Sequence, residues 1–540
     1  MEVDLLTAVA VGVLILLIYH YVANKYQYFL SKPIPCVKPT FLVGNRGAAI
    51  FRTKDVRQQT DELYYAFPNS KVVGFYELTK PVFMIRDPDV IKQITVRDFD
   101  YFMDHTPTFS GNRTEDDDSA TGLFANSLFA LRGQKWKDMR STLSPAFTGS
   151  KMRVMFDLVV ECSQSMVEHF RSEAKAGKRL ECEMKDVFSR FGNDVIATVA
   201  FGIKVDSLRD PSNEFYVKGK QMLDFQSFTI VIKFLLFATM PWLMRKLKVD
   251  FVDADLAVFF KKIIKDNMKQ REVHGIVRND MIQMLMDVRK GTLKHGKDDQ
   301  ELNDAGFATV KESQVGKSTH ARVWTENELT SQCFLFFLAG FDTVSSCLTF
   351  LAYELTLNPD IQNQLYEEVA DTERSLGGKA PSYETLQKMK YLDMVVSETL
   401  RKWTPTVDTD RYANRDYLLD DGAGLQFVIE NGLQINIPIL AIHNDPKYFP
   451  NPERFDPERF SEENRSKIVP GSYLPFGAGP RNCIGSRLAL MEVKLVVYYL
   501  LKDFSFEPTE KTDVPIMLTK KAVDVRTENG AWVEFKPRNL

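Results

Sequence analysis

A glycine-rich segment that leads into an apolar helical pattern constrains this chain more than any other feature. It reads PFGAGPRNCIG over residues 475–485 and is followed at once by SRLALMEVKLVVYYLLKDF. Its cysteine, Cys483, therefore stands at the mouth of a helix, where the helix dipole and backbone N–H groups stabilise a thiolate. Gly477, Gly479 and Gly485 remove side chains where a broad, flat group could approach the backbone. The pattern predicts that the Cys483 thiolate is the single axial ligand of a haem iron.

The other cysteines give no sign of a disulfide framework or of a zinc or iron–sulfur site. The chain has 6 cysteines in 540 residues, and no two of them form a CxxC pair. This usage is typical of a reducing compartment. With 69 basic residues, 72 acidic residues and a net charge of −3, the sequence also gives no reason to expect a nucleic-acid partner.

The amino-terminal stretch predicts a membrane anchor. Residues 5–24 (LLTAVAVGVLILLIYHYVAN) contain no charged side chain, and about 20 apolar residues suffice to cross a bilayer as a helix. Acidic residues precede the stretch and no small-residue cleavage site follows it, which disfavours a secretory signal. Lys25, Lys32 and Lys38 come next, so the positive-inside rule places the rest of the chain in the cytosol.

Behind the anchor we expect a short joint and one large domain. Several prolines make residues 25–45 a stiff, non-helical hinge between the anchor (1–24) and a domain over 46–540. Short β-type runs at 71–96 come first, and mainly helical patterns follow them from about 134 onward.

Two polar stretches interrupt the domain. Residues 290–323 are Gly-spotted and weakly periodic, which is typical of a long surface loop, although a domain boundary is also open. Residues 114–122 (TEDDDSATG) are acidic and more typical of a solvated loop tip than of a binding site.

A long central helix carries residues that an ordinary core helix avoids. Thr325 begins a T-x-x-E capping box, and helical apolar character then runs from 329 to 357. Gly340 costs about 1 kcal/mol relative to Ala inside a helix, and the Asp342 carboxylate is costly to bury unless it is paired. Close helix packing and an outward-facing turn would explain them separately. Together with the Thr343 hydroxyl, they indicate a ligand that approaches the helix at a bend.

A second motif follows further along the chain. Residues 384–402 predict a helix on which Glu398 and Arg401 share one face, three positions apart. A proline-rich segment, FPNPERFDPERF, occupies residues 449–460.

These motifs together resemble the cytochrome P450 family. The segment FGAGPRNCIG carries the fixed positions of its haem signature, F-x-x-G-x-R-x-C-x-G, at Phe476, Gly479, Arg481, Cys483 and Gly485. The family's E-x-x-R motif is matched at Glu398–Arg401, and its P-x-x-F-x-P-x-R-F motif at 452–460. Its oxygen-binding A-G-x-D-T motif is matched at 339–343, and its W-x-x-x-R motif at Trp136–Arg140. Val344 departs from the Ser or Thr that many members carry. The resemblance covers essentially the whole chain. It implies a mainly α-helical fold with small β-sheets, as a single large haem domain behind an N-terminal transmembrane helix.

The resemblance also implies a role for each motif. Cys483 would bind the iron of haem b, and Thr343 and Asp342 would deliver protons to dioxygen, the co-substrate. The residues implied to hold the haem are Trp136, Arg140, Arg411, Phe476, Arg481, Gly340 and Gly485. Glu398, Arg401 and Arg459 would form a structural ion network that supports the cysteine loop.

The expected substrate pocket is assigned by position in the same family pattern. Its predicted residues are Phe109, Phe124, Phe129, Phe337, Val407, Met517 and Leu518. An apolar, Phe-rich cavity suits lipophilic substrates held more by shape than by hydrogen bonds.

The expected partners are electron donors, because the sequence carries no motif for binding NADPH. The sequence has no G-x-G-x-x-G motif and no P-loop, so NADPH is not expected to bind it directly. Electrons would come from NADPH–cytochrome P450 reductase on the endoplasmic reticulum membrane, with cytochrome b5 as a further partner. Lys135, Lys137, Arg140 and Lys494 could meet an acidic partner on the sulfur side of the haem, or could be ordinary solvated cations.

The function expected from the resemblance is a monooxygenase that inserts one atom of dioxygen into lipophilic molecules. The chain looks like insect microsomal enzymes of the detoxification group, which commonly oxidise plant toxins and insecticides. An endogenous hormone or lipid hydroxylase stays open, as does a haem–thiolate isomerase that needs no external electrons. A haem protein that only sequesters ligands is a third alternative. The retained pair Asp342–Thr343 argues against the isomerase, because a peroxide substrate needs no activated dioxygen.

Overall fold

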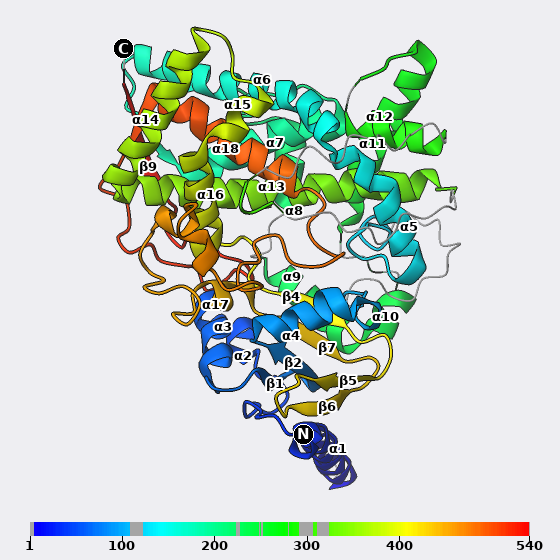
Figure 1. Ribbon diagram of the computed structural model, residues 1–540. Helices are drawn as coiled ribbons and strands as arrows, with labels where there is room; N and C mark the ends of the chain where they lie inside the picture. Colours follow the sequence, from blue (N-terminus) through cyan, green and yellow to red (C-terminus); the bar gives the residue numbers. More distant parts are fainter. Residues whose placement is uncertain are drawn as a thin grey trace.

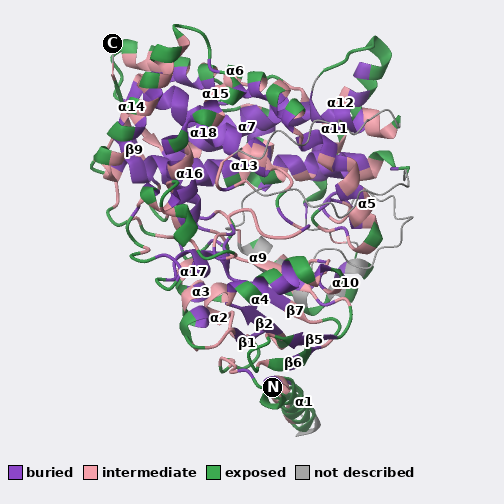
Figure 2. Cartoon of the chain, in the orientation of Figure 1, coloured by how far each residue is buried: buried purple, intermediate pink, exposed green. Residues whose placement is uncertain are grey.

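The computed structural model describes residues 5–107, 122–222, 227–247, 249, 252–278, 280–290, 306–309 and 323–538. In Figure 1 long helices lie stacked in one part of the molecule, with β9 beside them, while β1, β2, β5, β6 and β7 gather at the other end, and α1 projects beyond these strands. Buried residues concentrate in the stacked helices, whereas α1 is exposed along most of its length (Figure 2). The fold is mainly α-helical with small β-sheets, as the sequence predicts.

The described helices have the following bounds. The α-helices are α1 (Leu5–Lys25), α2 (Gly47–Ile50), α3 (Val56–Tyr65), α4 (Pro88–Lys92), α5 (Gly133–Leu143), α6 (Gly149–Lys175), α7 (Met184–Phe201), α8 (Glu214–Met222), α9 (Phe228–Thr239), α10 (Pro241–Lys246), α11 (Ala254–His274), α12 (Met281–Arg289), α13 (Glu326–Leu357), α14 (Pro359–Leu376), α15 (Tyr383–Lys388), α16 (Lys390–Lys402), α17 (Ile439–His443) and α18 (Ser486–Asp503). Short 3-10 or π turns are η1 (Tyr28–Ser31), η2 (Gln93–Arg97), η3 (Phe99–Tyr101), η4 (Ser144–Phe147), η5 (Pro457–Phe460) and η6 (Arg465–Lys467).

The largest described sheet brings one strand to the functional site. Its order is β1 (Val72–Glu77), β2 (Lys80–Ile85), β7 (Gln434–Ile437) and β4 (Thr409–Tyr412). Strands β2 and β7 are parallel, whereas the other neighbours are antiparallel. A second sheet joins β3 (Glu181–Glu183), β9 (Trp532–Pro537) and β8 (Phe504–Glu507), and β5 (Tyr417–Asp420) pairs with β6 (Gln426–Ile429).

Helix α13 is the central helix, and it begins where the sequence predicts. Thr325 Oγ1 accepts the Glu328 N–H at 3.2 Å, and Glu328 Oε2 accepts the Thr325 N–H at 2.9 Å, so the capping box is confirmed. The helix continues through Gly340 without a break. A Cβ on Gly340 would lie 2.8 Å from Ile196 Cδ1 of α7, and one on Gly192 of α7 would lie 3.2 Å from a carbonyl oxygen of α13. The two glycines therefore allow α7 and α13 to cross closely.

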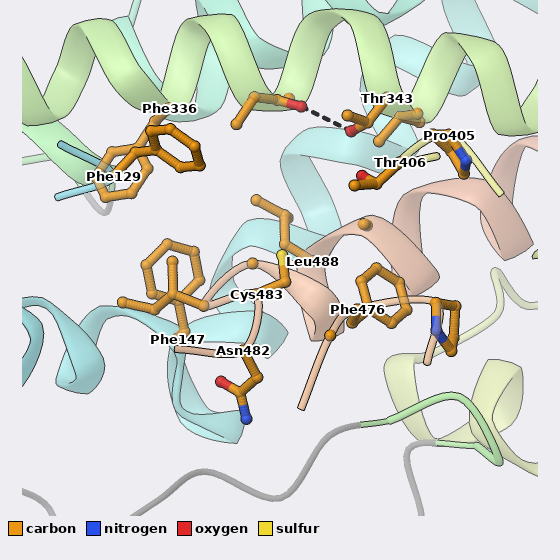
Figure 3. Close-up of a pocket in the computed structure, with 18 of the residues that line it drawn as sticks. Phe129, Phe147, Phe336, Thr343, Pro405, Thr406, Phe476, Asn482, Cys483 and Leu488 are labelled. Carbon is orange, nitrogen blue, oxygen red and sulfur yellow. Dashed lines mark hydrogen bonds between the residues drawn. The ribbon is translucent and has the colours of Figure 1, made fainter. Parts of the chain in front are cut away.

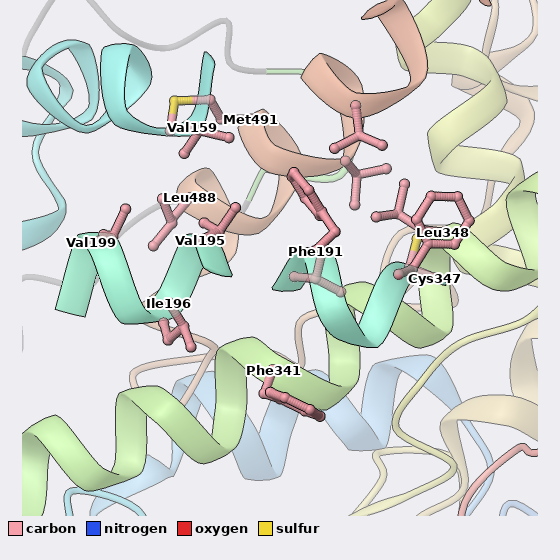
Figure 4. Close-up of a cluster of buried hydrophobic side chains, with 14 of the residues drawn as sticks. Val159, Phe191, Val195, Ile196, Val199, Phe341, Cys347, Leu348, Leu488 and Met491 are labelled. Carbon is pink, nitrogen blue, oxygen red and sulfur yellow. The ribbon is translucent and has the colours of Figure 1, made fainter. Parts of the chain in front are cut away.

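The core lies where α7, α13 and α18 meet. Figure 4 shows Val195 and Ile196 of α7, Phe341 and Leu348 of α13, and Leu488 of α18 in one apolar cluster. A helix that is apolar on all sides has to be buried, and α13 is covered in this way on most of its length. This packing fixes α13 relative to α18, and α18 starts directly behind the cysteine loop.

The segment 25–45, predicted to be a stiff hinge, is docked on the largest described sheet. Phe29 is buried against β1, where a Cβ on Gly74 would lie only 2.7 Å from its ring. Cys36 forms a parallel bridge with the same Gly74. The helical stretch Thr7–Ser31 has a mean hydropathy of 1.8, and only 6% of its most apolar window is buried. It is therefore a candidate transmembrane anchor.

The helix predicted over 384–402 is two helices, α15 and α16. Met389 separates them with an extended backbone (ψ 93°), and its side chain is buried in the core. The Glu368 carboxylate of α14 then accepts the N–H groups of Tyr391 and Leu392 at 2.9 and 2.8 Å. A carboxylate from another helix thus satisfies the first turn of α16, which sequence periodicity does not reveal.

Candidate active site

A cavity of about 330 Å³ lies between α13, α5 and the loop that carries Cys483. Figure 3 shows Thr343 on one wall and Cys483 on the opposite wall, with Phe129, Phe147 and Phe336 between them at one end. Its lining is mostly apolar, with a few convergent polar groups. Such a lining is typical of a site for a large organic ligand.

The Cys483 sulfur is open to this cavity, although the residue lies deep inside the chain. The Cys483 N–H donates to the Phe476 carbonyl at 2.9 Å, which closes the loop into a tight turn. Burial raises the pKa of the Cys483 thiol, while a hydrogen bond from the Gly485 backbone and the positive charge of Arg140 lower it. Burial has the largest effect, so the pKa lies above its usual value, and the backbone and Arg140 offset only part of the rise.

The glycines of this loop serve two different purposes. A Cβ on Gly479, which has a φ of +72°, would come within 1.8 Å of the Thr95 carbonyl oxygen. Only glycine fits here, because the backbone at Thr95 lies too close for a side chain. Gly485 has only Phe147 near its missing Cβ, at 3.9 Å, and lines the cavity. Gly485 fits the predicted close approach of a flat group, whereas Gly479 has a packing role.

Three predicted arginines and one tryptophan come together at the rim of the cavity. Arg140 donates to the Asn482 carbonyl at 2.8 Å and to its side-chain oxygen at 2.7 Å. Arg481 donates to the Met103 and Leu131 carbonyls at 2.7 Å each. Its guanidinium lies 4.2 Å from the centre of the Trp136 ring. The arginines thus hold the cysteine loop against α5 and the segment before it.

The same cluster leaves positive charge directed at the cavity. Burial lowers the pKa of Arg411 to about 10, and burial with the neighbouring charges of Arg411 and Arg140 lowers that of Arg481 to about 9. Arg411 Nε has no hydrogen-bond partner among the described residues. Guanidinium groups pair well with carboxylates, so an anionic ligand at this rim would relieve both features. This donor set, with one sulfur below an apolar cavity, fits haem and its two propionates.

His105 is a cavity residue that sequence reasoning missed. Its Nδ1 lies 2.7 Å from Asp410 Oδ1, and its ring stacks on Phe129 with centroids 4.6 Å apart. Burial lowers the pKa of His105, although the Asp410 carboxylate raises it. The two partners are separated by 305 positions in the chain, so no local pattern signals the contact.

Thr343 and Asp342 point to different sides of α13. Thr343 lines the cavity and donates from Oγ1 to the Ala339 carbonyl at 2.7 Å (Figure 3). The Asp342 carboxylate lies away from the cavity, 2.8 Å from Lys185 Nζ and 2.9 Å from Arg526 Nη2. Burial raises the pKa of Asp342, but the charges of Lys185 and Arg526 outweigh this effect and hold the pKa below its usual value. The structure brings Thr343 to the cavity but not Asp342.

A smaller cavity of about 220 Å³ lies behind α13, on the Asp342 side. Lys185, Ser346 and Arg526 line it, together with residues of β3 and the carboxy-terminal segment. The ion pair around Asp342 is therefore next to a polar cavity of its own.

Of the predicted substrate residues that the structure describes, only Phe129 lines the main cavity. Phe337 is fully buried among Phe201, Phe215 and Phe260 on another side of α13. Phe124 packs in the core and Met517 is exposed. The two remaining described positions, Val407 and Leu518, belong to a small cluster around Trp403, and Phe109 lies outside the described residues.

Helix geometry, applied strictly, would have predicted one of the residues that line the cavity instead. Phe336 lines the cavity, seven positions before Thr343, and seven positions are about two helical turns. Phe337 is one position further and so falls on a different face. The apolar lining that sequence analysis missed includes Phe147, Ile196, Leu335, Phe336, Val396, Leu400 and Leu488.

The predicted ion network is assembled beneath the cysteine loop. Arg401 Nε lies 2.7 Å from Glu398 Oε2, and Arg459 Nε lies 3.5 Å from Glu398 Oε1. The side chains of Glu398 and Arg401 are fully buried. Arg401 also donates to the Pro452 carbonyl at 2.7 Å, so the network ties α16 to the proline-rich segment.

The cations that could meet an acidic partner, or could be ordinary solvated side chains, are engaged within the chain. Lys135 pairs with Glu328 at 2.7 Å, Lys137 with Asp100 at 3.1 Å and Lys494 with Asp393 at 2.6 Å. Arg140 is buried at the cavity rim, as described above. These positions do not form an open basic patch in the described structure.

Glu492 of α18 is a buried carboxyl group that lines the cavity, and its Oε1 has no hydrogen-bond partner among the described residues. Burial alone raises its pKa to about 8. The folded protein therefore holds a proton that the unfolded chain releases at much lower pH. Stability falls by about 1.4 kcal/mol per pH unit between the unfolded and folded pKa values.

We expect Glu492→Gln to remove this loss. The variant should gain thermal stability relative to the parent as pH rises from 5 to 8, and its melting temperature should depend less on pH. Circular dichroism melts at several pH values measure the effect, with exposed Glu463→Gln as the control. A parent and variant with parallel pH profiles would contradict the expectation.

Comparisons with known proteins agree with this geometry. A family model described as cytochrome P450 matches residues 35–533. The chain is 40% identical to a probable cytochrome P450 9f2 of Drosophila melanogaster, over 97% of each chain. It is also 40% identical to cytochrome P450 9e2 of Blattella germanica, over 98% of this chain and 97% of the relative. Cytochrome P450 6k1 of the same insect is 35% identical over 98% and 96%.

Proposed function

Because the chain belongs to the cytochrome P450 family, we propose that it is a membrane-anchored monooxygenase that oxidises lipophilic xenobiotics with electrons from NADPH. One observation carries the proposal. The Cys483 sulfur and the Thr343 hydroxyl line opposite walls of a single apolar cavity (Figure 3). The family binds haem through a cysteine thiolate, and of the two cysteines that line this cavity Cys483 is exposed whereas Cys347 is buried.

The residues that would hold the haem are those already assembled at the cavity. Cys483 would ligate the iron, and Trp136, Arg140, Arg411 and Arg481 would bind the propionates. Phe476 lines the cavity beside the sulfur and would keep water from it. When bound, the thiolate-ligated haem supplies cleavage of the O–O bond of dioxygen and transfer of one oxygen atom to the substrate.

The protein's own contribution on the other wall is to hold and move protons. Thr343 is the hydroxyl placed over the cavity by α13, and its hydrogen bond to Ala339 can be exchanged for one to a ligand. Asp342 lies on the polar side of the same helix turn, where Lys185 and Arg526 keep it charged. We infer that a proton from the polar cavity behind α13 reaches Thr343 past Asp342, once Asp342 has loosened one of its ion pairs.

The lining supports a lipophilic substrate class. Phe129, Phe147, Phe336 and Leu335 supply apolar surface, and few side chains point hydrogen-bonding groups into the part between α13 and the loop. Selection by shape and hydrophobic contact suits plant toxins or insecticides better than a polar metabolite. Of the alternatives, an endogenous hydroxylase would act at the same site by the same chemistry.

We further propose that the electron donor is NADPH–cytochrome P450 reductase, with cytochrome b5 as an auxiliary partner, on the endoplasmic reticulum membrane. The exposed apolar helix α1 supports an anchor of this kind, with the catalytic domain on the cytosolic side. A reductase held on the same membrane is concentrated near its acceptor, because both diffuse in two dimensions.

Turnover of a fluorogenic lipophilic probe tests this function. The purified full chain should produce fluorescence only when both NADPH and reductase are present. Product made with a peroxide alone, and none with NADPH and reductase, would indicate the haem–thiolate isomerase class instead. No turnover under either condition, across a broad panel of probes, would favour a protein that only binds ligands.

Thr343→Ala should separate electron consumption from product formation. The haem and substrate sites remain intact, but the proton held at Oγ1 is lost, so product per NADPH should fall by about tenfold or more. Thr349→Ala is the matched control, because Thr349 makes the same kind of bond, to Ser345 at 2.6 Å, on the other side of α13. An unchanged ratio of product to NADPH in Thr343→Ala would contradict the role of the hydroxyl.

A further inference from the structure

Four described residues from the long polar stretch 290–323 are seated beside the cysteine loop. The segment Gly306–Thr309 closes a turn in which the Thr309 N–H donates to the Gly306 carbonyl at 3.1 Å. Ala308 is 4% exposed and belongs to the main hydrophobic core. A stretch whose composition predicts only a surface loop therefore makes buried contacts near the site.

The Phe307 ring contacts the start of the loop that carries Cys483. It lies 5.5 Å from the ring of Tyr473 and 5.1 Å from that of Phe460, measured between ring centres. Tyr473 in turn donates its hydroxyl hydrogen to the Ser397 carbonyl of α16 at 2.9 Å.

Tyr473 also passes this restraint along the chain. Its ring stacks on His443, with centroids 5.3 Å apart. His443 Nε2 accepts the N–H of Leu474, the next residue, at 2.7 Å. Two residues further, the Phe476 carbonyl accepts the Cys483 N–H. Phe307 thus packs against Tyr473, the residue at which the cysteine loop begins.

Helix α18, which follows the loop, is held to α16 by an ion pair. Lys494 of α18 and Asp393 of α16 are 2.6 Å apart, with side chains 4% and 17% exposed. The Phe307 N–H donates to the second carboxylate oxygen, Asp393 Oδ2, at 2.9 Å. A shielded ion pair is favourable only when its remaining oxygens are also hydrogen-bonded. The segment supplies that bond, and α18 begins three residues after Cys483.

Gly306 is needed for the segment to pack against Asp393. Its φ is +111°, which favours glycine, and a Cβ there would lie 2.1 Å from Asp393 Oδ1. Any side chain at position 306 would push the segment off the ion pair.

We propose that the segment Gly306–Thr309 positions the Cys483 loop by clamping its start, at Tyr473, and the helix that follows it, α18, at the Asp393–Lys494 pair. It is a positioning element and touches no substrate or cofactor. The clamp keeps the sulfur at one height and orientation in the cavity wall. Without it, the loop gains freedom, and the sulfur leaves the iron more readily. The inference depends on Cys483 being the haem ligand, as proposed above.

The test is the stability of the thiolate bond in holoprotein. Reduced protein with bound carbon monoxide shows a characteristic absorbance band only while the thiolate ligates iron, and its decay in mild urea can be followed with time. We expect Phe307→Ala and Gly306→Ala each to accelerate this decay by about fivefold or more, the factor that about 1 kcal/mol provides. Phe307→Leu, which retains apolar contact with Tyr473, should lie between the parent and Phe307→Ala.

Phe170→Leu is the control for general loss of core packing. Phe170 of α6 is also buried and contacts Phe535 at 5.1 Å, on β9, outside the clamp. Decay that is unchanged in both Phe307→Ala and Gly306→Ala would overturn the proposal. So would decay that follows the melting temperature equally in these variants and in Phe170→Leu. A parent protein that never shows the thiolate band would instead refute the haem–thiolate function itself.

Discussion

Replacing Cys483 with alanine is expected to abolish the thiolate band and to lower product formation by at least about a thousandfold. Cys483 is the sulfur at the base of the cavity, and the Gly485 backbone and Arg140 offset part of the rise in its pKa that burial causes. Without the thiolate, no side chain of the loop can donate electron density to the iron. The reduced, carbon monoxide-bound spectrum and probe turnover measure the two effects.

Cys347→Ala is the matched control for this experiment. Cys347 is a second thiol that lines the same cavity from α13, one turn beyond Thr343. Burial raises its pKa to about 12, so it is an uncharged thiol. The Cys347→Ala variant should keep the band and most of the turnover. If the band survives in Cys483→Ala but disappears in Cys347→Ala, the ligand is Cys347 on α13, and the assignment of Cys483 is wrong.

Replacing Arg401 with methionine is expected to lower the free energy of unfolding by about 3–5 kcal/mol. Arg401 is fully buried and donates to both oxygens of Glu398, at 2.7 and 2.9 Å, and to the His443 and Pro452 carbonyls. Burial raises the pKa of Glu398, and Arg401 opposes this effect. Its loss removes two of the hydrogen bonds to a buried carboxyl group, which keeps only the Asp456 N–H and the more distant Arg459, and leaves two carbonyls without this donor. Urea denaturation followed by circular dichroism measures the change, and the yield of haem-loaded protein should fall with it.

Arg374→Met shows what a surface arginine contributes by comparison. Arg374 pairs with Asp371 on α14, but their side chains are 76% and 66% exposed. Water solvates both groups when the pair is broken, so the expected change is less than about 1 kcal/mol. Similar losses in Arg374→Met and Arg401→Met would contradict the view that the buried network supports the fold beneath the cysteine loop.

Several parts of the site follow from local patterns, and the structure contains them as predicted. The Thr325 capping box requires only that two residues stand three positions apart at a helix start. The contact between Glu398 and Arg401 has the same spacing on one helix face. The turn that presents Cys483 depends on glycines within ten residues of it. Short-range chain geometry determines such features, so the sequence alone reveals them.

Other parts depend on rotation about a helix axis and on distant partners. Phe337 was predicted at the cavity, but α13 is turned so that Phe336 occupies that wall and Phe337 joins an aromatic core. Met389 interrupts a helix pattern because its side chain is drawn into the core, and Glu368 from another helix stabilises the new start. These outcomes depend on which neighbour is present, and periodicity does not contain that information.

By itself, the sequence determined the turn that presents the Cys483 sulfur, the central helix, the buried ion network and the exposed apolar helix at the amino terminus. Only the tertiary structure decided that Asp342 faces Lys185 and Arg526, which are 157 and 184 positions away, and that a segment of the polar loop clamps the cysteine loop. The physical reason is the range of the forces involved. Backbone caps and turns are fixed by residues within a few positions, whereas a buried charge or ring takes whichever partner the packed chain brings within contact distance.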